Sequence, residues 1–465
     1  MQTSSRNSIT RIALLSPPIG NGNLGDEATV AAVIQNLTRR CPTATIYAFS
    51  ANPDDTRKRH DITAFSVTRP SRRSVVPISS RVRTSAQSYT EILSMPHERI
   101  KAALKALPPI YAVLKAIRAA PTGVLDFLDE VRFLATSFRR LKGTDLLIVT
   151  GSGILSDHFG GFLNFPLTLF KWSLLAKATR TYLAFLSVGA GPICSPLSTR
   201  LVKHSLSLAS YRSCRDVTSK QVLEDLGVPG VTPVFPDLAM SLRVDPTPSR
   251  PDNHRPIVGI NVFPHFDPRY WPVSDTTKYQ RYITIIASFA AWLIHKRYQI
   301  CFFPTQIRAD PPVIQDIKNL LAKNGVAALE TSLLEATIDT LTDLTTSLAT
   351  ADLIVATRFH GISISLLLNK PVLAISNHHK MTDLMADMGQ SQYLLDIDTF
   401  TRESLIERFT ALESNSETFK YQVARRLAEH RYALDRQYDV LLEKVTGGAT
   451  PSTADRLSHG RYAIT

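Results

Sequence analysis

The chain has 465 residues, a formal net charge of +13 and an apolar share of 44%. Its length predicts two or three domains, and its apolar share is ordinary for a globular protein with a substantial core. Residues 1–145 hold 21 Lys and Arg against 11 Asp and Glu. This bias favours an anionic partner, such as a phosphorylated ligand, an acidic glycan, an anionic lipid surface or a nucleic acid.

Cysteine usage argues against a secreted, disulfide-rich protein, and hydropathy argues against a membrane-spanning one. The scattered cysteines lack the spacing of a zinc site and argue against a secreted disulfide framework, which favours reduced thiols in the cytosol. No signal peptide is expected in the polar N-terminus. Residues 162–186 are strongly apolar but carry three basic residues, so no spanning helix is expected there. We expect a soluble, cytoplasmic protein, which leaves peripheral contact with the inner face of the membrane open. The cysteines are Cys41, Cys194, Cys214 and Cys301.

Apolar periodicity predicts strands that alternate with helices along most of the chain. The predicted strands are 11–16, 45–49, 144–150, 180–188, 211–216 with a turn, 232–235, 257–262, 299–303, 353–356 and 371–375. The predicted helices are the one that ends near 38, then 98–118, 124–140, 165–177, 197–209, 218–226, 279–295, 312–324, 341–349, 362–368 and 403–444.

A turn rich in Gly and Asn, residues 17–28, follows the first strand. Gly20, Gly22 and Gly25 fit the spacing G-x-G-x-x-G, but no acidic ribose partner follows at the expected distance, so the dinucleotide fingerprint is weak. No Gly-Lys-Ser/Thr closes the turn, which excludes a Walker loop. Similar glycine turns follow the strands that end near 150 and 188.

Residues 52–83 are polar and basic. Such a run is typical of a solvated loop. A role in nucleic-acid binding would need interleaved aromatic residues for stacking, and Phe65 is nearly the only one. We therefore expect a loop that faces a lipid surface or an acceptor more than a nucleic acid, and no nucleic-acid partner.

Residues 244–255 are rich in Pro, Asp and Arg and lack apolar periodicity, which predicts a linker. The linker would separate an N-terminal α/β domain, 1–243, from a C-terminal α/β domain, 256–400. A helical segment, 401–446, and a disordered tail, 447–465, would follow. Two β/α series in tandem predict two doubly wound Rossmann-like domains that face each other across a cleft.

The stretch 351–365 reads as a buried strand, a sharp turn and a helix. The turn carries Arg358 and His360 at the carboxyl edge of a parallel sheet, where open α/β folds bind ligands. A fixed cation and a titratable imidazole at a helix start suit an anionic substrate that must also be protonated. The alternative is that Arg358 pairs with a carboxylate and His360 caps the helix.

Four segments, each at a strand end, together resemble the polysaccharide pyruvyl transferases. They are similar to that family's N-x-G-D-x-A turn, its GGG turn, its S-x-R-D-x-x-S segment with a following Leu-Gly, and its R-x-H…G-x-P…K segment. The matching residues are Asn23-Leu24-Gly25-Asp26-Glu27-Ala28, Thr150-Gly151-Ser152-Gly153, Ser213-Cys214-Arg215-Asp216-Val217-Thr218-Ser219 with Leu226-Gly227, and Arg358-Phe359-His360-Gly361 with Asn369-Lys370-Pro371 and Lys380.

Some positions depart from the family pattern. Ser152 replaces the middle glycine of the GGG turn, and Asn369 stands where the family commonly has Gly. The segment 236–238 lacks the usual second proline, and the basic segment 52–83 has no clear counterpart. These departures motivate the alternative of a diverged, non-catalytic member that binds glycan.

The resemblance implies a two-domain fold like that of GT-B glycosyltransferases. It also implies transfer of the pyruvyl group of phosphoenolpyruvate onto two hydroxyls of one sugar, as a ketal, with release of phosphate. The acceptor would be a polysaccharide precursor, such as a lipid-linked oligosaccharide. No metal and no cofactor besides the donor substrate are expected. A nucleotide-sugar-dependent glycosyltransferase of the same fold is the alternative enzyme.

The resemblance also assigns residues to this chemistry. His360 is the expected general acid that protonates the donor at carbon, and Arg215 and Arg358 are the expected cations for its carboxylate and phosphate. The expected substrate-binding residues are Asn23, Gly25, Asp26, Gly151, Ser152, Gly153 and Lys380.

Each assignment has a simpler alternative. Arg215 could form an ion pair with Asp216 alone, and Lys380 could be an ordinary surface lysine. Asp26 could act as a base for the acceptor, although we expect it to cap its helix. The adjacent histidines at 378 and 379 are expected to face solvent rather than bind a metal, because no carboxylate partner is evident. Asp157 and His158 are expected to be loop structure.

Overall fold

The computed structural model describes residues 8–70, 108–158, 160–244, 255–271, 273–326 and 329–447, without the side chains of 108–124 and 329–330. Two compact units make up the chain: Met1–Val67 together with Gly143–Thr465, and Thr68–Lys142. Residues 245–254 of the predicted linker lie outside the described residues, and so do the residues of the predicted tail after 447. No helix in the described residues is long and apolar enough to cross a membrane.

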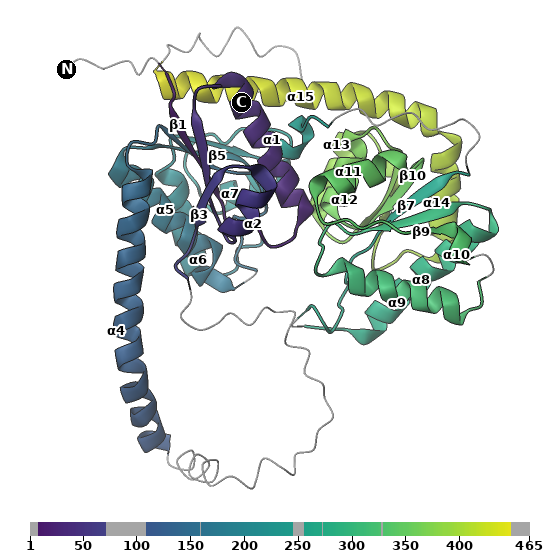
Figure 1. Cartoon of the computed structure of the whole chain (residues 1–465), viewed down its shortest axis with the longest axis horizontal. Coiled ribbons are helices and arrows are strands. Elements are labelled where there is room, and N and C mark those ends of the chain that lie inside the picture. The colour runs from purple at the N-terminus through teal and green to yellow at the C-terminus, as the bar shows by residue number, and fades with distance from the viewer. Residues whose placement is uncertain are drawn as a thin grey trace. The chain divides into compact units, whose positions relative to one another are not determined.

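The larger unit contains two six-stranded parallel sheets (Figure 1). The first sheet has the order β3-β2-β1-β4-β5-β6, and the part of the chain around it is called the N-lobe here. Its four central strands, β2, β1, β4 and β5, are mostly apolar, as expected where helices cover both faces of a sheet. The strands are β1 Arg11–Ser16, β2 Thr45–Ser50, β3 Thr63–Ser66, β4 Leu146–Val149, β5 Tyr182–Val188 and β6 Tyr211–Cys214.

The second sheet, in the C-lobe, has the order β12-β11-β10-β7-β8-β9. Counted from β7, this is the same 3-2-1-4-5-6 order as in the N-lobe, which is the order typical of Rossmann domains. The prediction of two doubly wound domains is therefore confirmed. The strands are β7 Ile257–Asn261, β8 Gln299–Phe303, β9 Leu333–Leu334, β10 Leu353–Ala356, β11 Val372–Ser376 and β12 Leu394–Asp396.

Helices connect the strands and form the outer layers (Figure 1). The N-lobe helices are α1 Leu24–Arg40, α2 Pro53–His60, α5 Phe165–Thr179, α6 Pro196–Ser207 and α7 Val217–Asp225, with short 3-10 turns η3 Gly161–Leu163 and η4 Leu238–Ser241. The C-lobe helices are α8 Thr276–His295, α9 Asp310–Lys323, α10 Leu329–Ser332, α11 Leu341–Thr350, α12 Phe359–Leu367, α13 His379–Asp387 and α14 Arg402–Ser414, with η5 Ser391–Tyr393. The smaller unit contains α4, Pro108–Leu141.

The structure corrects several predicted elements. Part of the basic segment 52–83 is not a loop, because it forms α2 and β3; residues 71–83 are outside the described residues. Residues 232–235 form only an isolated bridge, from Val234 to Cys214, rather than a strand. The two helices predicted over 98–140 are one helix from residue 108 onward, and 98–107 is not described.

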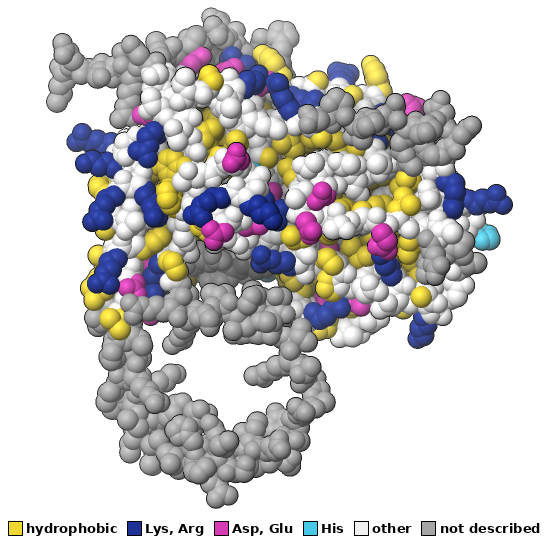
Figure 2. All heavy atoms as spheres, viewed as in Figure 1, with side chains coloured by type: hydrophobic (Ala, Val, Ile, Leu, Met, Phe, Trp, Pro, Cys, Tyr) yellow, Lys and Arg dark blue, Asp and Glu magenta, His cyan; other side chains and the backbone are white. Residues whose placement is uncertain are grey.

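Charged side chains do not form a continuous basic stripe on the face drawn in Figure 2. There, Lys and Arg lie in small separate groups, several of them beside Asp or Glu. On α2, for example, Arg57 and Arg59 pair with Asp54 and Asp55 of the same helix. Local acidic partners therefore offset part of the positive charge of the first third of the chain.

The last helix, α15 (Ser416–Thr446), packs against both lobes (Figure 1). Near its C-terminal end, Gln437 is fully buried and donates to Ser213 of β6 at 2.6 Å. Its amide oxygen accepts from the hydroxyl of Ser187 in β5 at 3.2 Å. Near its N-terminal end, Arg426 donates to the carbonyl of Asp387 in α13. The helix therefore ties the two lobes together.

We predict that Gln437→Ala lowers the free energy of unfolding by about 1–3 kcal/mol, because it leaves two buried hydroxyls without their amide partner. Chemical denaturation measures this loss. Tyr432→Ala, on the same helix but 67% exposed, is the control and should change stability by less than about 0.5 kcal/mol. Equal effects of the two substitutions would contradict the anchoring role of Gln437.

Candidate functional site

The two sheets place most of the motif segments at their switch points. In a doubly wound sheet, ligands bind beyond the carboxyl ends of the strands where the strand order reverses. That point lies between β1 and β4 in the N-lobe and between β7 and β10 in the C-lobe. The turns that leave β1, β4 and β10 carry three of the four motif segments. The fourth follows β6, where Arg215 begins the turn into α7.

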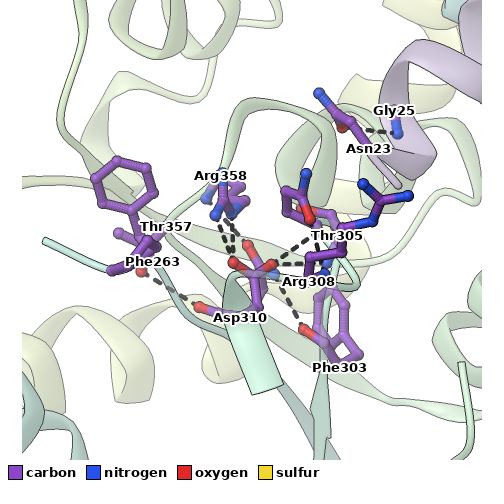
Figure 3. A network of polar contacts seen from close by, with 12 residues as sticks. Asn23, Gly25, Phe263, Phe303, Thr305, Arg308, Asp310, Thr357 and Arg358 are labelled. Atoms are coloured by element: carbon purple, nitrogen blue, oxygen red, sulfur yellow. Dashed lines mark hydrogen bonds and ion pairs between the residues drawn. The ribbon is translucent and has the colours of Figure 1, made fainter. Parts of the chain in front are cut away.

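The turn after β1 is joined to the turn after β8 of the other lobe. The backbone N–H of Leu24 donates to the carbonyl of Thr305 at 2.8 Å, and the N–H of Ile307 donates to the carbonyl of Gly22 at 2.9 Å. Asn23 and Gln306 form a bridge between these bonds. Figure 3 shows Asn23 beside this C-lobe loop. The two lobes therefore meet through backbone groups next to the motif residues.

Arg358 is held by a buried carboxylate, as the simpler sequence alternative proposed. Asp310 begins α9 and is fully buried, and its Oδ1 accepts from Nε of Arg358 at 2.8 Å and also from Nη2 (Figure 3). Its Oδ2 accepts from the backbone N–H groups of Thr305 and Gln306, each at 2.9 Å. Burial raises the pKa of Asp310, and the charge of Arg358 opposes that rise. One carboxylate thus fixes both the cation and the interlobe turn.

The backbone of Arg358 has a second anchor at the end of β7. Its N–H donates to Oδ1 of Asn261 at 3.0 Å, while Nδ2 of Asn261 donates to the carbonyl of Phe303 at 3.0 Å. The guanidinium carbon lies 4.9 Å from the centre of the Phe263 ring. Arg358 also occupies the N-cap position of α12 without a side-chain cap. The alternative in which His360 caps this helix is therefore wrong.

Arg215 is paired with two carboxylates and not with Asp216 alone. Its Nε donates to Asp216 and its Nη1 to Asp237, both at 3.3 Å. The Arg215 side chain is 8% exposed, and its guanidinium carbon lies 4.8 Å from the centre of the Phe359 ring. A Cβ at Gly189 would lie 2.6 Å from Nη2 of Arg215, so only glycine leaves room for this side chain.

Lys380 shares the Phe359 ring with Arg215. Its Nζ lies 5.6 Å from the ring centre, and among the described residues no carboxylate forms an ion pair with it. The side chain is half-buried, so the reading of Lys380 as an ordinary surface lysine is wrong. Burial first, and then the charges of Arg215 and Arg358, lower the pKa of Lys380 to about 8. This cation is the one most available to an anionic ligand.

His360 lies among these cations and touches the opposite lobe. A Cβ at Gly25 of α1 would lie 1.9 Å from the His360 ring, so the imidazole rests directly on that glycine. Burial, the largest cause, lowers the pKa of His360 to about 4, and the charges of Lys380, Arg215 and Arg358 act in the same direction. The nearby carboxylate of Asp237 opposes them.

Asp26 does not cap α1, contrary to our expectation. Asn23 is the N-cap and accepts from the N–H of Gly25 at 3.1 Å. Asp26 is 7% exposed, and its two oxygens accept from Nδ2 of Asn23 at 2.7 Å and from Oγ of Ser152 at 3.0 Å. Burial raises the pKa of Asp26 to about 6, against the lowering effects of Ser152 and Lys380. The carboxyl group of Asp26 therefore gains or loses its proton near pH 6.

Two glycines of the turn after β4 differ in their surroundings. Gly151 packs closely on β5, since a Cβ there would lie 2.7 Å from the carbonyl oxygen of Ser187. Gly153 is exposed, and its Cα lies beside Gly189, the residue that packs against Arg215. Gly153 is therefore next to a neighbour of the charged cluster, whereas the position of Gly151 is explained by strand packing.

A pocket of about 210 Å³ adjoins this cluster. It is smaller than the roughly 300–1,000 Å³ that drug-sized ligands occupy, so it fits a small ligand. Residues of both lobes line it, including Arg215, Asp216, Asp237, Phe359, Lys380 and Asp383. The lining residues do not include Arg358, His360 or Asp26. The pocket therefore reaches only the side of the cluster that Arg215 and Lys380 form.

Within the part of the chain that the structure describes, one group of side chains has ligand atoms close enough for a metal. Such atoms of Asp216, His379 and Asp383 lie within 4.8 Å of one another. This overturns the expectation that the histidine pair lacks a carboxylate neighbour. His378 is half-buried and caps α13, with Nδ1 accepting from the N–H of Lys380. The two carboxylates of the group are also engaged elsewhere, by Ser219 and Thr218 respectively.

Sequence reasoning missed three residues that hold the site together. Asp237 pairs with Arg215, Asp310 pairs with Arg358, and Asn261 anchors the turn after β10. A polar residue at the end of a buried strand was the available signal for Asn261. Asp310 stands directly before Pro311, a combination typical of a helix start, but its pairing with Arg358 is a long-range contact that the sequence does not show.

The raised pKa of Asp26 predicts a stability change in Asp26→Asn. A carboxyl with a folded-state pKa of about 6 and an ordinary value of 3.8 disfavours folding when it is ionised. This penalty is complete above pH 6 and disappears below about pH 4. We expect the variant to gain roughly 2–3 kcal/mol at pH 7.5 and little at pH 4. Denaturation at both pH values measures the difference, and an equal effect at both would contradict it.

The contact between Gly25 and His360 predicts a non-additive pair of substitutions. Gly25→Ala should cost about 1–3 kcal/mol of folding free energy, because its methyl group overlaps the imidazole. In a His360→Gly background, which also removes the Cβ that would lie 2.3 Å from the new methyl group, the same change should be neutral or gain up to about 1 kcal/mol, since alanine is the better helix former. A double-mutant cycle by denaturation tests this, and additive effects would contradict the contact.

Solved structures with a similar fold include, according to their titles, UDP-N-acetylglucosamine 2-epimerases and a glycosyltransferase, at low sequence identity. A UDP-N-acetylglucosamine 2-epimerase matches with TM-score 0.54 and 12% identity over 96% of this chain and 98% of its own. A putative UDP-N-acetylglucosamine 2-epimerase from Listeria monocytogenes matches with TM-score 0.53 and 13% identity over 96% and 98%. A glycosyltransferase from Rickettsia africae matches with TM-score 0.51 and 11% identity over 95% and 100%. These likenesses show the fold alone, two Rossmann-like domains of the GT-B type, as predicted.

Among individually curated proteins, none matches this sequence. The sequence model of one family, described as polysaccharide pyruvyl transferase, matches residues 23–379. The matched range includes the turn that begins at Asn23 and the turn with Arg358 and His360. Because the match covers most of the chain, the protein belongs to the polysaccharide pyruvyl transferase family.

Proposed function

We propose that the protein transfers the pyruvyl group of phosphoenolpyruvate onto two hydroxyls of a sugar in a glycan precursor, as a ketal, and releases phosphate. Membership of the family, together with the cations that surround His360, is the observation that carries this proposal. Phosphoenolpyruvate bears a phosphate and a carboxylate, so its site needs more than one cation. Arg215, Arg358 and Lys380 supply them from the segments that follow β6, β10 and β11.

The ion pairs of the two arginines favour a rigid site. Arg215 and Arg358 are held in place by Asp237 and Asp310, so their remaining N–H groups are oriented without further ordering on binding. Preorganised donors of this kind stabilise charge more effectively than mobile ones. Lys380, which has no ion pair among the described residues, contributes an uncompensated positive charge. The pocket beside Arg215 and Lys380 has a size suited to a small anion.

Proton transfer to the donor is assigned to His360. The positive charges of Arg215, Arg358 and Lys380 help to hold its pKa near 4. An anion bound among those cations offsets their charge and raises the pKa of the imidazole. Binding of the donor therefore prepares the imidazolium that the chemistry needs. The protonated ring can then deliver its proton to the methylene carbon of the enol phosphate.

We predict that phosphoenolpyruvate raises the melting temperature of the wild type, as any ligand of the folded state does. Lys380→Gln removes one cation without breaking an ion pair and should weaken this binding by roughly 10- to 100-fold, as expected for a lost charge-assisted contact. Lys323→Gln, at the exposed end of α9, is the matched control. His360→Ala should retain binding but lose phosphate release with a suitable glycan acceptor.

The same titration separates the alternatives. Stabilisation by a UDP- or GDP-sugar, and none by phosphoenolpyruvate, would favour a nucleotide-sugar glycosyltransferase instead. Full phosphate release by His360→Ala would remove that residue from the mechanism. Arg358 should be replaced together with Asp310, for example as Arg358→Gln with Asp310→Asn, because removal of the cation alone leaves a buried charge unpaired and destabilises the fold.

A further inference from the structure

Ketal formation removes two hydroxyl protons from the acceptor. The proposed function names only one protein group, His360, for proton transfer. One hydroxyl proton must leave as the first C–O bond forms, and the second must leave as the ring closes. The products, a ketal and hydrogen phosphate, take one proton on the former methylene carbon and one on the phosphate. Two protein groups that alternate between acid and base would complete this exchange without help from solvent.

We propose that Asp26 is the second catalytic group, the base that takes the first hydroxyl proton of the sugar acceptor. The inference rests on the proposed function and extends it. Asp26 belongs to α1 of the N-lobe, whereas His360 begins α12 of the C-lobe. The His360 ring rests on Gly25, the residue directly before Asp26. The imidazole therefore lies against the residue next to Asp26, at the contact between the lobes.

The surroundings of Asp26 suit a base and not a structural carboxylate. The carboxylates of Asp237 and Asp310 form ion pairs with Arg215 and Arg358. Asp26 has no ion pair among the described residues. Its hydrogen bonds come from two neutral donors, Asn23 and Ser152. The charged groups that face it are Glu27 on its own helix, Lys380 of α13 and Asp237. A carboxylate without a bound cation keeps its affinity for a proton.

Burial agrees with this role, since it raises the pKa of Asp26 to about 6. A general base works best when its pKa lies near the working pH. At pH 7 most of the Asp26 population is ionised, yet it binds a proton far more readily than an exposed aspartate. Helix capping, the other role for this residue, is already performed by Asn23.

Every proton that leaves a hydroxyl in one turnover has an acceptor, and both protein groups return to their starting state. In the first half, the acceptor oxygen bonds to C2 of phosphoenolpyruvate, its proton goes to Asp26, and the imidazolium of His360 protonates C3. In the second half, the C2–O bond to phosphate breaks and phosphate leaves with the electron pair. The second hydroxyl then bonds to C2, its proton returns to His360, and Asp26 protonates the phosphate. Both groups end as they began.

Ser152 is a direct hydrogen-bond partner of this base. The family turn that it resembles has glycine at this position, whereas here the hydroxyl donates to Oδ1 of Asp26. That bond stabilises the ionised carboxylate and lowers its pKa. Ser152→Gly should therefore raise the pKa of Asp26. In the donor complex, where the bound anion raises the pKa of His360, the low-pH limb of kcat reports Asp26 and would move to higher pH, while the high-pH limb would stay in place.

Phosphate release by the full chain, measured with phosphoenolpyruvate and a panel of glycans that carry vicinal or 1,3-related hydroxyls, tests the proposal. Asp26→Asn should lower kcat at least about 100-fold and retain stabilisation by phosphoenolpyruvate. The fold should survive this change, because the Ser152 hydroxyl can turn to accept from the new amide. Asp54→Asn, 90% exposed on α2, is the control and should keep wild-type kcat.

The outcomes separate the two levels of inference. A wild type that turns over, with Asp26→Asn within threefold of it or with an unmoved low-pH limb in Ser152→Gly, overturns the role of Asp26 alone. A wild type that neither binds phosphoenolpyruvate nor releases phosphate with any of these glycans overturns the proposed function and this inference with it. Loss of kcat in Asp26→Asn, with binding retained and the limb shifted in Ser152→Gly, supports both.

Discussion

The buried ion pair between Arg358 and Asp310 is the interaction on which the site depends. Asp310 is fully buried, and the desolvation of such a pair is balanced only when every oxygen has a partner. Here the second oxygen binds the N–H groups of Thr305 and Gln306, the same turn that bonds to the turn after β1 in the N-lobe. A single carboxylate thus couples the direction of a cation to the contact between the lobes.

That coupling explains why the motif residues belong to turns from both lobes. Each lobe by itself has one switch point and an incomplete set of groups: Asp26 and Arg215 in one, Arg358, His360 and Lys380 in the other. The contact of His360 with Gly25 brings the sets together, and α15 secures the lobes from outside. Contacts between the lobes therefore assemble the candidate site as well as the fold.

The sequence could reveal the fold because each signal for it is local. Buried parallel strands are apolar runs, so β1 and β8 were predicted with the ends that they have. Short edge strands such as β3 and β12 were not predicted, because three or four partly exposed residues are too few to form a distinct pattern. The charged residues at strand ends could also be found in this way. Their partners could not, since Asp237 and Asp310 reach the arginines through long-range contacts.

Asp26 shows most clearly that the role of a carboxylate depends on the side chains that pair with it. From the sequence, an aspartate at the start of a helix reads as a cap, and only the structure shows that Asn23 has taken that place. Once freed from capping, a buried carboxylate without a cation is costly to stability, and such a cost persists where the group is used. Asp237 and Asp310 differ from it in one respect, the guanidinium that each one holds. The same residue type therefore orients cations at two positions and, at the third, remains available to a proton.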